Sequence, residues 1–367
     1  MHPKLRNTHR ARFPARLTAG LWAAPLMTRV RAAAGLWAAP LMTRVRTAAG
    51  LWAAPLMTRV RTAAWAARAL TASLVWVALL FWTALLIGAG AAHAGDKEFD
   101  SHWHDGKAEL NGYNLKVSRY GQERDGNCVM IYVTEPFSES KRVKVDDPNR
   151  NPSDTFDALK LNIVRDFQTG IYDYNTMISI FVHSDDFSPA KISFTSAEWC
   201  GHVYEELRFD PTSISGHYYS YFENESGPRN LKVATDGVAE DNLFILLRGL
   251  RGEYLEPGKK ISIQLLPSVY FGRLSHKPMA WIGAEIKREK KMMRIKVPAG
   301  RFNTMVYRVK VDDGREGVFY IEEQYPHRIV KWQFAPDIVA ELTGSERLQY
   351  WRLNKNGHED YLKKLGL

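Results

Sequence analysis

The two cysteines of the chain, Cys128 and Cys200, are the residues whose chemistry would restrict the function most. In an oxidising compartment two thiols tend to pair, so the sequence predicts a disulfide between them. Closing so long a loop would stabilise the fold by roughly 4 kcal/mol. The alternative is two separate thiols, because Cys128 lies within an apolar run. A disulfide would exclude catalysis by a cysteine nucleophile.

The segment from Glu198 to His202 (EWCGH) brings a carboxylate, a thiol and an imidazole close together in sequence. An imidazole can lower the pKa of a nearby thiol, and residues i and i+2 share one face of a strand. Cys200, His202 and Glu198 are therefore candidate catalytic residues of a cysteine-dependent enzyme. Gly201 can instead break the alternation, which makes the segment a packed turn. The sequence has no Gly-rich phosphate loop, nucleophile elbow or HExxH motif.

His102 and His104 are candidate metal ligands, because an extended segment would place both imidazoles on one face. Such a pair can bind Zn²⁺ or Cu²⁺ when a third ligand folds in. The alternative is that these histidines have no metal-binding role. The prediction is that the protein needs no metal and no other cofactor.

Aromatic residues provide candidates for ligand binding. On a curved sheet they can line a concave apolar pocket for an acyl chain or a peptide. The alternative is that they form ordinary core. The candidates are Tyr172, Tyr174, Tyr219, Tyr221 and Trp281.

The elements that would position these residues are predicted to be antiparallel strands. Lys107–Tyr120 and Cys128–Glu135 flank a turn-forming segment, and Phe302–Val311 and Glu316–Glu323 flank an Asp-Gly turn. Asp-Gly between alternating runs is a strong hairpin signal, since Gly readily takes the positive φ of a tight turn.

Helical patterns are few: Phe156–Asp166, Asn242–Arg248 and Ser345–Leu353. Many short strands with turn signals between them favour a barrel or a sandwich. The predicted fold is mainly β, an antiparallel half-barrel or sandwich with a few short helices.

The basic residues are concentrated before this β part. Of 50 Lys and Arg, 12 lie in residues 1–94, which contain no Asp or Glu. Residues 95–367 contain the other 38 basic residues and all 40 acidic residues, so this part of the chain is close to neutral. This distribution excludes a polybasic nucleic-acid binder. Residues 1–64 contain a tandem repeat that starts at Gly20, Gly35 and Gly50, with a 15-residue period. We interpret it as a recent duplication that is disordered or not translated.

Residues 65–94 are predicted to be a signal peptide or a signal anchor. Leu74–Ile87 is almost entirely apolar, basic residues precede it, and small residues at Ala92 and Ala94 suit a signal peptidase. Cleavage after Ala94 would release residues 95–367 as an exported β domain, periplasmic or secreted. Without cleavage this segment would anchor the protein in the inner membrane. Residues 226–229 (SGPR) are a candidate boundary between two halves of this domain.

The segments Val297–Phe302 (VPAGRF) and Phe319–Trp332 resemble a family of exported bacterial β proteins. The fold of that family is similar to the curved half-barrel of periplasmic lipoprotein carriers. Asp166–Tyr174 and Glu198–His202 are similar to chains named septum-formation inhibitor Maf. The nucleotide-pyrophosphatase motifs of that name are absent here, so the resemblance implies a fold and a compartment but no catalytic residue.

These observations predict an exported envelope protein that binds an apolar or envelope-derived ligand, such as a lipid, without catalysis. Two alternatives remain: a periplasmic enzyme that uses Cys200 and His202, and a structural partner in an envelope complex. Nucleic acid is not an expected partner, and the membrane is one only through an uncleaved signal segment.

Overall fold

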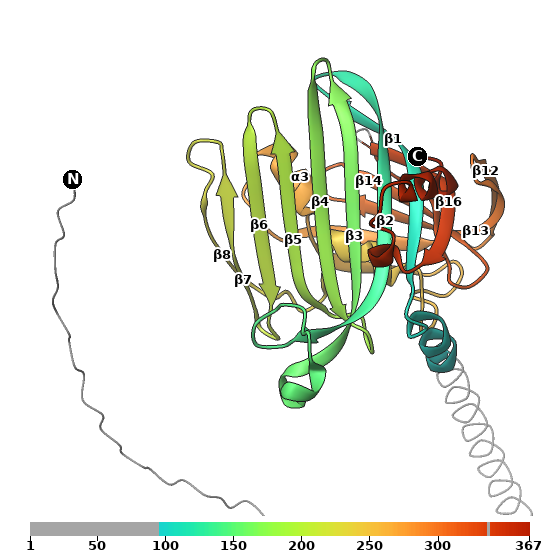
Figure 1. Ribbon diagram of the computed structural model, residues 1–367. Coiled ribbons are helices and arrows are strands. Elements are labelled where there is room, and N and C mark those ends of the chain that lie inside the picture. The colour runs from blue at the N-terminus through green and yellow to red at the C-terminus, as the bar shows by residue number, and fades with distance from the viewer. Residues whose placement is uncertain (1–94, 336–337) are drawn as a thin grey trace, which may run out of the picture. The chain divides into compact units, whose positions relative to one another are not determined.

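The computed structural model describes residues 95–335 and 338–367. Most of this part of the chain forms one 16-stranded sheet (Figure 1). The strands are β1 (Ala108–Arg119), β2 (Gln122–Ser138), β3 (Thr155–Thr169), β4 (Tyr172–His183), β5 (Pro189–Glu198), β6 (Gly201–Phe209), β7 (Ser213–Ser220), β8 (Gly227–Lys232), β9 (Gly237–Ala239), β10 (Lys260–Leu266), β11 (Ile282–Arg288), β12 (Met293–Val297), β13 (Gly300–Val311), β14 (Glu316–Glu322), β15 (Ile329–Ala335) and β16 (Ile338–Leu348).

The sheet is built almost entirely from antiparallel neighbours. Strands β1 to β8 follow one another as a meander, and β1 also pairs with β16, which continues the sheet through β15, β14, β13, β11 and β10. The last strand, β9, pairs in parallel with β10, and β12 pairs with β13 outside the main path.

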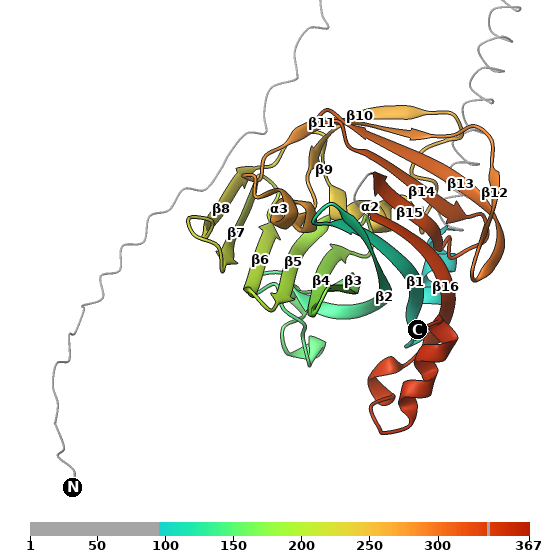
Figure 2. The ribbon, with the colours of Figure 1, turned by 90° about the horizontal axis from the view of Figure 1, so that it is seen from above.

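The sheet curls back on itself because a short link joins its two edge strands. Strand β8 ends at Lys232 and β9 begins at Gly237, so the connecting chain spans less than about 20 Å. The indole of Trp281, just before β11, donates a hydrogen bond of 2.8 Å to the carbonyl oxygen of Lys232. Seen from above, the sheet encloses α2 and α3 (Figure 2).

Two short helices, α2 (Leu243–Leu246) and α3 (Val269–Ser275), pack inside the curve. The ring of Phe244 packs edge-on against Phe319 and Trp332, with centroids 5.2 and 5.1 Å apart. Successive side chains of a strand point to opposite faces of the sheet, so every second residue faces the inside of the curve. In β4 these inward residues include Ile178, Ile180 and Val182, which are fully buried. The core therefore lies between the concave face of the sheet and the helices.

The predicted fold class is confirmed, since this part of the chain is mainly β with few helices. The helix predicted within Asn242–Arg248 is present as α2 and the 3₁₀ turn before it, Glu240–Asn242. The helix predicted at Phe156–Asp166 is wrong, because those residues belong to β3. Buried side chains at Leu159, Leu161 and Ile163 follow the two-residue period of a strand.

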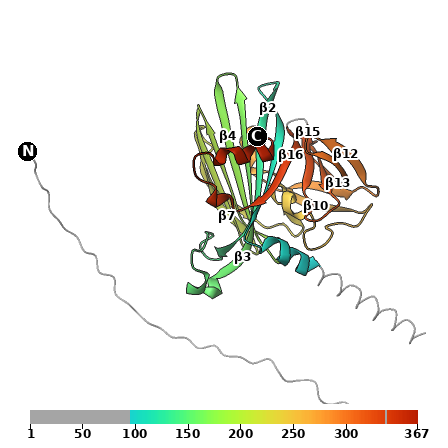
Figure 3. The same cartoon turned by 45° about the vertical axis from the view of Figure 1, so that its right-hand side comes forward.

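The helix predicted at Ser345–Leu353 is also wrong. Strand β16 runs to Leu348, and a 3₁₀ turn at Tyr350–Arg352 follows. A second 3₁₀ segment, His358–Leu365, lies on the outer face of the sheet over β1 and β16 (Figure 3). Two short 3₁₀ turns, Pro148–Arg150 and Pro152–Asp154, precede β3.

The repeat and the signal segment, residues 1–94, lie outside the described residues. Among the residues that are described, no helix combines the length and apolar character needed to span a bilayer. The boundary predicted at residues 226–229 falls at the start of β8, which pairs with β7.

Candidate functional site

The two cysteines are far apart in the sheet. Cys128 is buried in β2, Cys200 is exposed in the turn between β5 and β6, and both are free. Strands β3 and β4 separate β2 from β5, which corresponds to about 14 Å across the sheet. A disulfide needs Cα atoms within about 7 Å, so the predicted disulfide is wrong. Burial raises the pKa of the Cys128 thiol to about 12.

The segment 198–202 forms the β5–β6 turn and does not assemble a catalytic triad. Glu198 pairs with Gly201, so its side chain and that of His202 lie on opposite faces of the sheet. The Glu198 carboxylate is buried against Arg273 of α3, with 2.6 Å between Oε1 and Nη2, whereas His202 is exposed. Gly201 packs under the ring of Tyr221, where a Cβ would lie 2.4 Å from Cγ.

The two candidate metal-ligating histidines do not share an extended face. His102 lies in a helical segment, residues 95–103, and His104 in the turn after it. His102 Nε2 is 2.8 Å from Arg347 Nη1, and burial together with this cation lowers the pKa of His102 to about 4. His104 Nε2 is 2.9 Å from Asp157 Oδ2. Within residues 95–335 and 338–367, no group of three His, Cys, Asp or Glu side chains is placed to hold a metal ion.

The five candidate aromatic residues separate into different environments. Tyr174 is buried and its hydroxyl lies 2.6 Å from that of Tyr120, while the ring of Tyr172 is 6.1 Å from Trp199. Tyr219 and Tyr221 are exposed, at 55% and 62%. Tyr172 and Tyr174 are neighbours, with ring centroids 6.4 Å apart.

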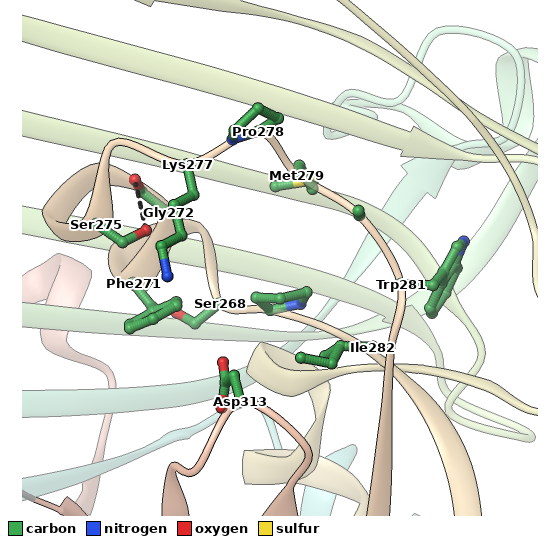
Figure 4. A pocket seen from close by; sticks show the side chains of 12 residues that line it. Ser268, Phe271, Gly272, Ser275, Lys277, Pro278, Met279, Trp281, Ile282 and Asp313 are labelled. Atoms are coloured by element: carbon green, nitrogen blue, oxygen red, sulfur yellow. Dashed lines mark hydrogen bonds between the residues drawn. The ribbon is translucent and has the colours of Figure 1, made fainter.

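Trp281 does line a pocket, between α3 and the start of β11 (Figure 4). The pocket has a volume of about 220 Å³. Its wall is mostly apolar and contains one cationic side chain, Lys277, and one anionic side chain, Asp313. The lining residues are Pro267, Ser268, Phe271, Gly272, Ser275, Lys277, Pro278, Met279, Ala280, Trp281, Ile282 and Asp313.

Helix α3 is fixed at both ends, which holds this pocket in shape. At its start, the Ser268 hydroxyl accepts a hydrogen bond from the Tyr270 amide and donates one of 2.6 Å to Asp241 Oδ1. Asp241 Oδ2 also accepts from the Val269 amide at 3.1 Å. Towards its end, Arg273 forms the ion pair with Glu198 on β5.

A second, smaller cavity of about 40 Å³ lies in the interior and shares Ser268 and Phe271 with this pocket. It is lined by aromatic rings of α2, α3 and β15 and by two buried arginines, Arg165 and Arg315. Arg315 is held by Glu240, whose two carboxylate oxygens are 2.7 and 3.0 Å from Nη1, and by Asp313. Burial raises the pKa of Glu240 to about 7, although Arg315 opposes that rise.

Sequence reasoning missed Arg165, although a signal for it exists. In β3 the side chains of Ile163, Arg165 and Phe167 are all buried, so the arginine occupies an inward position of an alternating strand. A charged residue at such a position usually has a specific partner or role. Recognising β3 as a strand would have brought Arg165 to attention.

Comparisons with known proteins are limited to distant structural likeness. No family model matches the chain, and no curated protein does. A solved structure from Brucella abortus, described as a β-barrel-like protein of the domain of unknown function DUF1849, is 10% identical with a TM-score of 0.39. The match covers 66% of this chain and 98% of that one.

A DUF1089 family protein from Pseudomonas aeruginosa is 11% identical with a TM-score of 0.30, and the match covers 47% of this chain and 83% of that one. Neither description carries the name Maf.

Proposed function

We propose that this protein is a non-enzymatic binding protein that takes an apolar ligand into the pocket between α3 and β11. One observation carries this proposal: half-buried apolar side chains of Phe271, Met279, Trp281 and Ile282 surround a preformed pocket of about 220 Å³. Ligand sites in proteins are typically concave and mostly apolar, with few polar groups that orient the ligand. Lys277 and Asp313 are the charged groups of the wall.

A fluorescent apolar probe tests this proposal. N-phenyl-1-naphthylamine should bind the purified full chain with a rise in fluorescence. Met279→Asp should weaken binding at least about tenfold, because an unpaired carboxylate in an apolar pocket is costly. Met293→Asp is the matched control, since Met293 is exposed on β12 and does not line the pocket. Equal binding by both variants would contradict the proposal.

Export to the cell envelope is part of the same proposal and rests on the apolar segment Leu74–Ile87 and the small residues before Gly95. Mass spectrometry of the protein isolated from cells should find Gly95 as its first residue. An intact amino terminus in the cytoplasmic fraction would contradict export, whereas an intact terminus in the membrane fraction would indicate the anchored form.

A second candidate function, a structural partner in an envelope complex, is favoured by the hairpin tips. Odd-numbered strands of the meander end at one rim, and the turns there expose Tyr120, Ile171, Trp199 and Tyr221. Ile171 is 76% exposed and Trp199 is 66% exposed. A photo-crosslinker at position 199 should then join the protein to one envelope protein, and Ile171→Ser should reduce the yield. No adduct at position 199 would contradict this function.

A further inference from the structure

Arg165 lies in the interior without an acceptor for two of its donors. The residue is 3% exposed, and its Nε and Nη1 make no hydrogen bond within the described part of the chain. Its guanidinium stacks over the rings of Tyr270 and Trp332, at 4.7 and 5.5 Å from their centroids. A buried guanidinium without a hydrogen-bonded anion is costly, so a partner that supplies oxygen acceptors would stabilise it.

Two more residues that line the same cavity carry donors without a hydrogen bond in the described ranges: Nε1 of Trp332 and Nη2 of Arg315. The buried carboxylates nearby are engaged in other contacts. Glu240 accepts from Arg315 Nη1, and Asp241 accepts from Ser268 and from the backbone of α3. The residues that line the cavity therefore carry several hydrogen-bond donors with free capacity, which is the chemistry that recognises an anion.

The size and position of this cavity indicate which part of a ligand would enter it. Its volume is about 40 Å³, somewhat more than the roughly 10–15 Å³ of such space that one water molecule needs. A carboxylate is of this scale, whereas a phosphate ester or an acyl chain is larger. The cavity adjoins the apolar pocket through Ser268 and Phe271, and Figure 4 shows these side chains near Asp313 at one end of that pocket.

We propose that Arg165, Trp332 and Arg315 bind the carboxylate head group of an amphiphile whose apolar part occupies the pocket between α3 and β11. This inference rests on the proposed function and narrows the ligand class from apolar molecules to carboxylates with an apolar tail. Arg165 supplies a positive charge that forms no ion pair within residues 95–335 and 338–367, whereas Arg315 is already paired with Glu240 and Asp313.

Calorimetric titration of the full chain with octanoate and with 1-octanol tests the assignment, because the two probes differ in their head groups. Octanoate should bind about ten- to a hundredfold more tightly, as expected for charge-assisted hydrogen bonds. Arg165→Met should abolish this preference, because it should weaken octanoate binding at least about tenfold and 1-octanol binding much less. Arg294→Met, at an exposed position of β12, should keep the preference and serves as the matched control.

The outcomes separate the two proposals. If both probes bind wild-type protein equally, the head-group assignment is wrong, the donors meet only water, and the apolar pocket stands. If neither probe binds, the proposed function and this inference both fail. If Arg165→Met does not fold, Trp332→Phe decides, because it removes one donor and should reduce the preference for octanoate severalfold. An unchanged preference in a folded variant overturns the inference.

Discussion

Glu109 and Arg248 form an ion pair in the interior, with 3.0 Å between Glu109 Oε1 and Arg248 Nη1. Both side chains are almost completely buried, at 1% and 0% exposure. Arg248 Nη2 also donates to the carbonyl oxygen of Pro326 at 2.7 Å, and the guanidinium stacks over Tyr132. This pair therefore ties the segment after α2 to β1 and to the β14–β15 connection.

Removing one member of this pair should destabilise the fold strongly. Glu109→Ala leaves a buried guanidinium without its counter-ion, and we expect the free energy of unfolding to fall by about 3–5 kcal/mol. Urea denaturation followed by circular dichroism measures the change. Glu285→Ala, which removes an exposed pair with Lys260, should change it by less than about 1 kcal/mol. A similar fall in the free energy of unfolding for both variants would contradict the expectation that the buried pair contributes more to stability than the exposed one.

The two thiols should differ sharply in reactivity. In the folded protein, Ellman's reagent should react with Cys200, which is exposed, and not with Cys128, which is buried and whose pKa is raised to about 12. Guanidinium chloride without reductant should release the second thiol. Cys200→Ser should abolish the reaction of the folded protein. If no free thiol is detected in denaturant, the two cysteines form a disulfide and the assignment of two free thiols is wrong.

Local turn chemistry made part of the fold predictable. The Asp-Gly turn at Asp312–Arg315 joins β13 to β14, as expected from alternating runs on both sides. Strand β3 was not recognised, because its apolar residues also fit a helical pattern and only pairing with β2 and β4 decides between them. The pairing of β1 with β16 is a contact between distant segments that no local signal specifies.

The candidate site was less predictable for the same reason. Trp281 was among the expected ligand-binding residues, and it does line the pocket. Arg165, Arg315 and Trp332 come from three different strands or turns and meet only because the sheet curls around α2 and α3. These three residues line one cavity only because the sheet closes, and their spacing in the sequence gives no sign of that closure.

The C-terminal segment depends on two glycines that face each other on neighbouring strands. Gly112 of β1 pairs with Gly344 of β16, and a Cβ at either position would lie 2.2 Å from a carbonyl oxygen of the segment, Leu365 or Lys364 respectively. Gly344→Ala should therefore displace the segment and lower the free energy of unfolding by about 1–3 kcal/mol. Hydrogen exchange should accelerate in residues 358–367.

Gly227→Ala is the control for this change, because a Cβ at Gly227 would meet nothing within 4 Å. It should leave exchange in residues 358–367 at the wild-type rate. If hydrogen exchange in residues 358–367 also stays at the wild-type rate in Gly344→Ala, the close packing of this segment on β16 is not required to hold the segment in place.

Glu240 should make stability fall as pH rises from about 4.5 to about 7. Burial raises the pKa of this carboxyl from 4.5 to about 7 in the folded protein, so in that window the folded state binds the proton that the unfolded state has lost. The contribution of Glu240 is therefore fully present below pH 4.5 and is lost as the pH approaches 7, with a slope of at most roughly 1.4 kcal/mol per pH unit. Glu240→Gln, which keeps the shape without titrating, should flatten this part of the curve of unfolding free energy against pH. A variant with the same slope as the wild type would assign the pH dependence to other groups.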